Sequence, residues 1–63
     1  MRIEVWRVEL KSSTNTNTEI VFVRASNART AEKKSIAIER RKGKHGLKNP
    51  YCLSAAFHAY VEM

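Results

Sequence analysis

Two segments with alternating apolar and polar side chains constrain the fold of this chain most strongly. Residues 2–11 and 19–25 follow the two-residue period of a β-strand, and the second segment is rich in β-branched and aromatic side chains. Residues 11–18, with the sequence KSSTNTNT, are polar and predict a mobile loop between them. These patterns together predict an antiparallel hairpin.

The register of this hairpin determines which side chains share a face of the sheet. If Leu10 lies opposite Glu19, one face is largely apolar and consists of Trp6, Val8, Leu10, Val21, Val23 and Ala25. The other face then mixes apolar and charged side chains, namely Ile3, Val5, Arg7, Glu9, Ile20, Phe22 and Arg24. We expect a helix to cover the apolar face and to bury Trp6, because a small core needs the area of its largest side chain.

Residues 28–42 predict that helix. Ser26 or Asn27 is a suitable N-cap, and Gly43 predicts the end of the helix after a last turn rich in cations. A small, weakly apolar stripe suited to packing on a sheet is formed by Ala28, Ala31, Ser35 and Ile38.

The rest of the chain predicts a loop over residues 44–50 and a third strand that begins near Ser54, although Ala55, Ala56 and Ala59 also permit a helix there. The side chains expected to face the helix are Phe57, Ala59 and Val61, and those expected on the uncovered face are His58 and Tyr60. A right-handed crossover through the helix places this strand beside the first one. Residues 1–63 should therefore form a single α+β domain of ββαβ order, with a three-stranded antiparallel sheet (order 2-1-3) and one helix packed on one face.

A block of positive charge extends from Arg29 to Lys48. It holds eight Lys or Arg and two Glu, so its net charge equals the +6 of the whole chain, and Glu39 and Lys42 within it have the i,i+3 spacing of an ion pair. Charge this local indicates nucleic acid or an acidic protein surface as the partner, whereas the alternative is a solvated helix end. The candidate contacts are Arg29, Lys33, Lys34, Arg40, Arg41, Lys42, Lys44 and Lys48. The expected main phosphate contacts are Arg40, Arg41, Lys42 and Lys44.

A second candidate face combines two aromatic rings with two cations. Rings between cations are typical of surfaces that stack single-stranded bases. The residues of this face are Arg7, Phe22, Arg24 and Tyr60. The alternative interpretation is that both rings are ordinary packing residues.

Other kinds of site have little support in the sequence. His45, Cys52 and His58 do not form a zinc pattern and there is no Gly-rich phosphate loop, so we expect no metal, no cofactor and no enzymatic activity. A single cysteine fits a reducing setting, and no apolar run approaches the ~20 residues of a membrane span. We therefore expect a cytoplasmic protein without a membrane partner. The outer sheet edges would be open to a partner strand or to a homodimer.

The order of elements resembles that of the short phage-encoded inhibitors of bacterial RNA polymerase from T7-like phages. The resemblance extends over residues 3–61, and EIVFVRASNARTAEKKSIAIE carries it from the second strand into an alanine-containing helix. It is a similarity of topology, and the basic segment from Arg29 to Lys42 departs from the acidic helix of that family. The resemblance implies a small phage-type or mobile-element protein that blocks a host complex, including defence complexes that themselves handle nucleic acid. Such a protein would act in the host cytoplasm.

Three functions remain open from the sequence. The first is a small non-catalytic regulatory protein whose basic helix end and loop (residues 29–48) contact nucleic acid. The alternative is a phage-type inhibitor that docks on an acidic surface of a host complex, either RNA polymerase or a nucleic-acid-handling defence complex. The third is a structural subunit of a larger assembly.

Overall fold

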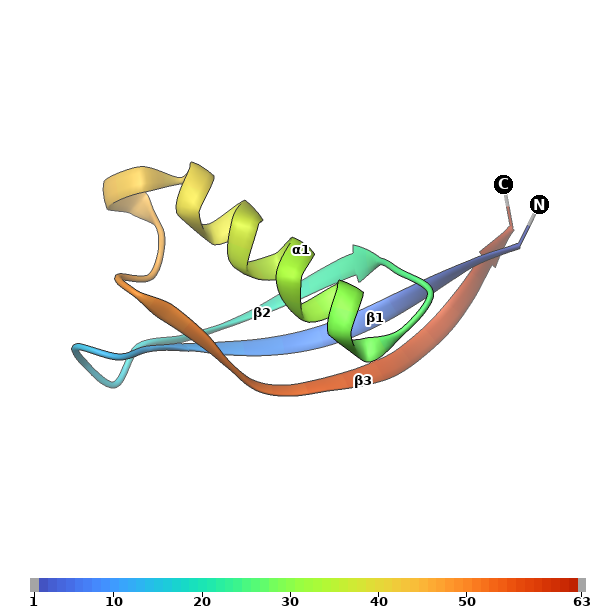
Figure 1. Ribbon diagram of the computed structural model, residues 1–63, viewed down its shortest axis with the longest axis horizontal. Helices are drawn as coiled ribbons and strands as arrows, with labels where there is room; N and C mark the ends of the chain where they lie inside the picture. Colours follow the sequence, from blue (N-terminus) through green and yellow to red (C-terminus); the bar gives the residue numbers. More distant parts are fainter. Residues whose placement is uncertain (1, 63) are drawn as a thin grey trace.

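A computed structural model describes residues 2–62 of the chain. The elements are β1 (Arg2–Ser12), β2 (Thr18–Arg24), α1 (Ala28–Arg41), the short 3-10 helix η1 (Gly43–His45) and β3 (Pro50–Glu62). The strands form one antiparallel sheet of order β2-β1-β3, and α1 lies along one face of it (Figure 1). The predicted ββαβ fold with sheet order 2-1-3 is confirmed, although β3 begins before the predicted start near Ser54.

The hairpin has the predicted register, with Leu10 opposite Glu19. Trp6 packs against the core but is only partly buried, so the prediction that it is buried is confirmed only in part. The indole lies near the point where the chain turns from β2 towards α1, and its Nε1–H donates to the Ala25 carbonyl oxygen at 3.0 Å. The buried core lies further along the sheet and consists of Val8, Leu10, Val23 and Ala31.

Two bulges interrupt the pairing of β3 with β1. Ala59 lies opposite Val5 whereas Phe57 lies opposite Trp6, so His58 is an extra residue on β3. A second shift, between Glu9 and Leu10 of β1, leaves Leu53 as another extra residue. Each extra residue changes the face on which the following side chains lie.

The bulge at His58 corrects the faces predicted for the end of β3. Ala59 and Val61 lie opposite Val5 and Ile3, which places them on the uncovered face and not against the helix. Tyr60 lies opposite Glu4, on the same side of the sheet as Trp6 and not on the uncovered face. The sequence pattern carries no signal of this extra residue, so strict alternation assigned these faces wrongly.

The cap and the end of α1 follow the sequence closely. Asn27 Oδ1 accepts the Thr30 N–H at 2.9 Å, which confirms one of the two predicted N-caps. The helix ends at Arg41, and Gly43 adopts a φ of +60°, which favours glycine after a helix end. Over the described residues, no helix combines the length and the apolar character needed to cross a membrane.

The buried stripe of α1 differs from the predicted one. Its buried side chains are Ala31, Ser35 and Glu39, whereas Ala28 is exposed and Ile38 is 37% exposed. The helix therefore turns a carboxylate inward in place of an isoleucine.

Candidate nucleic-acid interface

The end of the molecule opposite the chain termini brings together the last part of the basic segment and the hairpin loop (Figure 1). We call this surface the basic end and define it as residues 12–18 and 40–49. Ser12 Oγ donates to the Lys48 carbonyl oxygen at 2.8 Å, and Ser13 Oγ donates to the Asn49 carbonyl oxygen at 2.9 Å. Hydrogen bonds thus join two loops that are distant in the sequence.

Lys42, a predicted phosphate contact, is already engaged by two carboxylates. Its Nζ pairs with Glu19 Oε1 and lies 3.0 Å from Glu39 Oε2. The hydrogen bond with Glu19, followed by that with Glu39, raises the pKa of Lys42. Lys42 therefore pairs with both acids that flank the basic end, and these three side chains together carry a net charge of −1. Lys42 is poorly placed to contact a phosphate.

Glu39 holds the loop that follows the helix. Its side chain is fully buried, and Oε1 accepts the Leu47 N–H at 2.9 Å. Burial acts to raise the pKa of Glu39, but the hydrogen bond from Leu47 and the contacts with Glu19 and Lys42 outweigh it, so the pKa lies below its ordinary value. Gly46 packs so closely that a Cβ there would lie 2.4 Å from the Glu39 carbonyl oxygen. The predicted Glu39–Lys42 pair is confirmed, but the attachment of the loop was not foreseen.

Six of the predicted cations keep their charged groups exposed. None of them forms an ion pair or a side-chain hydrogen bond with another residue between positions 2 and 62. Four belong to the basic end (Arg40, Arg41, Lys44 and Lys48), and two lie near the start of α1 (Arg29 and Lys33). At the basic end, four free cations therefore lie near Lys42, whose own charge is already paired with Glu19 and Glu39.

The hairpin loop, predicted as mobile, carries its own hydrogen bonds. The Asn17 N–H donates to Asn15 Oδ1 at 2.8 Å, and the Ser12 N–H donates to the Asn17 carbonyl oxygen at 3.0 Å. Residues 13–17 are exposed, so their hydroxyl and amide groups share the basic end with the free cations. Sequence reasoning did not assign this loop to a site, although its richness in Ser, Thr and Asn is a signal of hydrogen-bonding capacity.

The second candidate face comes together only in part. Arg7 lies opposite Phe22 in the hairpin, and the centre of the Phe22 ring is 4.9 Å from that of His58. Tyr60 lies on the helix side of the sheet, where its ring centre is 4.9 Å from that of Phe57. The predicted platform of Arg7, Phe22, Arg24 and Tyr60 is therefore divided between two faces, because of the bulge at His58.

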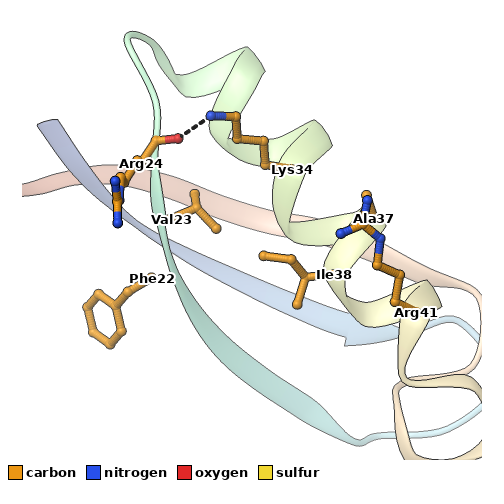
Figure 2. Close-up of a pocket in the computed structure, with 7 residues that line it drawn as sticks. All are labelled: Phe22, Val23, Arg24, Lys34, Ala37, Ile38 and Arg41. Atoms are coloured by element: carbon orange, nitrogen blue, oxygen red, sulfur yellow. Dashed lines mark hydrogen bonds between the residues drawn. The ribbon is translucent and has the colours of Figure 1, made fainter. Parts of the chain in front are cut away.

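A groove of about 420 Å³ lies between β2 and α1 (Figure 2). Three cations and no acid are among its lining residues, which are Phe22, Val23, Arg24, Lys34, Ala37, Ile38 and Arg41. Cys52 packs against the core elsewhere, and burial raises the pKa of its thiol. Within residues 2–62, no group of three or more His, Cys, Asp or Glu side chains is placed to hold a metal ion.

The fold and the basic end define a small α+β domain with localised positive charge. Comparisons of the chain with protein families, curated proteins and solved structures found no match. The chemistry of the exposed groups is therefore the basis for assigning a partner.

Proposed function

We propose that this chain is a small non-catalytic regulatory protein that binds nucleic acid through the basic end. The separation of charge at that end carries the proposal. Lys42 is held by Glu19 and Glu39, while Arg40 and Lys44 remain exposed and have no carboxylate partner among residues 2–62. Such cations bind phosphates by replacing the counterions of a polyanion.

The two kinds of group at the basic end would serve different purposes. The cations would contact phosphates, whereas the hydroxyl and amide groups of residues 13–17 can bond to phosphate oxygens, sugars or base edges. Phosphate contacts carry no base information. We therefore expect binding that depends strongly on salt and only weakly on sequence.

A double substitution tests the basic end directly. Arg40→Gln combined with Lys44→Gln removes two exposed cations and no buried contact. Anisotropy of labelled single-stranded and duplex oligonucleotides would be measured between about 50 and 200 mM salt. The slope of log affinity against log salt should become shallower by roughly 1.4 for single strands and 1.8 for duplexes, which corresponds to two lost phosphate contacts.

The matched control is Arg29→Gln combined with Lys33→Gln, which removes the same charge from the first turns of the helix. Arg29 lies about 16 Å from Arg40 along the helix axis, so the control should change the slope less. An equal reduction of the salt-dependence slope in both double variants would indicate a general charge effect and would refute a site at the basic end. Absence of binding by the parent at about 50 mM salt would refute the nucleic-acid function itself.

Binding to a protein is the second candidate function, and the exposed sheet supports it. β2 and β3 each have an outer edge, and apolar side chains beside them remain exposed, as with Phe22 at 55% and Leu53 at 48%. This function would fit a phage-type inhibitor that acts on a host complex in the host cytoplasm. A partner that is recovered from lysate after nuclease treatment would support it, and one that is lost would support nucleic-acid binding.

A further inference from the structure

The outer edge of β2 presents backbone groups that do not bond to β1. In an antiparallel pair, residues along each strand alternate between those bonded to the neighbouring strand and those directed away from it. The Ala25 N–H donates to the Glu4 carbonyl oxygen at 3.1 Å, so residues two, four and six positions before Ala25 also bond to β1. Ile20, Phe22 and Arg24 therefore direct their N–H and C=O groups to the open edge.

One of these outward groups already has a partner. The Arg24 carbonyl oxygen accepts a hydrogen bond from Lys34 Nζ at 2.8 Å, which agrees with its outward direction (Figure 2). The outward groups of Ile20 and Phe22 bond to no other residue between positions 2 and 62. They form an open edge to which a peptide in extended conformation can hydrogen-bond as an additional strand of the sheet.

The groove beside this edge has an apolar floor between cations. Val23 and Ile38 project into the space between strand and helix, whereas the Phe22 ring lies on the far side of β2 (Figure 2). Lys34 and Arg41 flank Ile38 along α1, and no acid lines the groove. Charge complementarity therefore favours a segment that carries acidic and apolar side chains. A second copy is disfavoured because two β2 edges would bring the same cations together.

The helix residues are spaced more closely than alternate residues of a strand, but Lys34 and Arg41 have long side chains that can bridge the difference. Along α1, Lys34 lies about 6 Å and Arg41 about 4.5 Å from Ile38, and side chains on one face of a strand recur about every 6.8 Å. An added strand can thus place acid, apolar and acid side chains at alternate positions against these three residues. Its intervening apolar side chains would lie beside Phe22. We infer that the groove binds an extended acidic and apolar segment of a partner protein as a fourth strand of the sheet.

A defined peptide tests this second site, which shares only Arg41 with the basic end. The probe is a labelled peptide with the core Glu-Val-Ile-Val-Glu between Gly-Ser flanks, measured by anisotropy at about 150 mM salt. One control peptide carries Lys in place of both Glu. Another carries Pro in place of the central Ile and of the Val after it, which removes a backbone donor from each side of the added strand. Binding of the probe and at least tenfold weaker binding of both controls is the expected result. Equal binding of either control would overturn the proposal, as would no binding of the probe.

Protein variants locate the peptide. Ile38→Glu should weaken peptide binding at least tenfold, whereas Leu53→Glu on the opposite edge strand should leave it unchanged. Lys34→Gln offers a second variant if Ile38→Glu alters the thermal melt, and it should also weaken binding. Unchanged affinity in folded Ile38→Glu and in Lys34→Gln would overturn the assignment of the groove. The Arg40→Gln, Lys44→Gln protein should keep its affinity for the peptide. The peptide test therefore remains valid even if the basic end does not bind nucleic acid.

Amide exchange gives a readout specific to an added strand. With free peptide at ten times its Kd, exchange at the outward Phe22 and Arg24 amides should slow by about tenfold. The Val21 and Val23 amides, which bond to β1, should change little. Binding without slower exchange at Phe22 and Arg24 would overturn strand addition. An oligonucleotide that displaces the peptide and slows exchange at the same amides would assign the groove to nucleic acid instead.

Discussion

Replacement of Glu39 tests how the loop of the basic end is held in place. Its buried carboxylate accepts the Leu47 N–H at 2.9 Å. A hydrogen bond to a charged group contributes about 1.5–3 kcal/mol, against about 0.5–1.5 kcal/mol for a neutral one. Glu39→Ala should therefore lower the free energy of unfolding by about 2–3 kcal/mol, and Glu39→Gln, which keeps an acceptor oxygen, by about 1–1.5 kcal/mol. The ion pair with Lys42 adds little, because that side chain is 36% exposed and hydrated.

These losses are large for a chain of 63 residues. Typical values per residue imply a total stability of about 3–9 kcal/mol, so Glu39→Ala should remove a substantial fraction of it. Urea denaturation at pH 7, followed by Trp6 fluorescence, measures the change, and amide exchange at Leu47 reports the loop itself. Glu32→Gln, on the exposed side of the same helix, is the matched control and should stay within about 0.5 kcal/mol of the parent.

The dependence on pH separates a charge effect from a packing effect. The pKa of Glu39 is lower in the folded chain than its ordinary value, so the ionised carboxylate stabilises the fold above that ordinary pKa. This contribution is lost as the pH falls through the folded-state pKa. The difference in stability between the parent and Glu39→Gln should therefore shrink between about pH 7 and about pH 3. A constant difference over this range, or a Glu39→Ala protein as stable as the parent at pH 7, would refute the reasoning.

Two further predictions concern the helix cap and the core. Asn27→Ala should lower the free energy of unfolding by about 0.5–2 kcal/mol, because the Thr30 N–H loses its acceptor. Ser26→Ala should have little effect in the same thermal melts. Comparable losses of stability in the two variants would contradict the cap assignment. Leu10→Ala, at a fully buried position, should cost about 2–5 kcal/mol in urea denaturation. Leu53→Ala, at a position that is 48% exposed, should cost less than about 0.5 kcal/mol. A larger loss of stability in Leu53→Ala than in Leu10→Ala would contradict the assignment of Leu10 to the core.

Local patterns were sufficient to predict much of the fold. Alternation in residues 2–11 and 19–25 predicted the hairpin. The pairing of Leu10 with Glu19 was the register assumed because it places the apolar side chains on one face, and the structure has this register. The Asn27 cap and the helix end before Gly43 are likewise local, because they depend on hydrogen bonds and dihedral angles within a few residues. The clustering of cations in residues 29–48 can be read directly from the sequence and needed no structure.

The faces of β3 could not be predicted in this way. The bulge at His58 adds one residue without any change in the apolar pattern, and it moves Tyr60 away from Phe22. The cost or benefit of a bulge depends on how β3 fits against β1 over its whole length, which is a tertiary property. The predicted aromatic platform was lost for this reason.

The order of residues in this chain determined that positive charge would gather near the end of the helix. Its alternating segments predicted which strands would pair. The tertiary structure alone decided which cations are free. Helical periodicity favoured Ile38 as the buried residue, because it ranks side chains by hydropathy and spacing. A carboxylate can be buried at the inner position only where hydrogen-bond donors or a cation contact it. Glu39 accepts the N–H of Leu47 from the following loop and pairs with Lys42 at the helix end. Those contacts depend on where the chain returns after the helix, which local sequence does not specify.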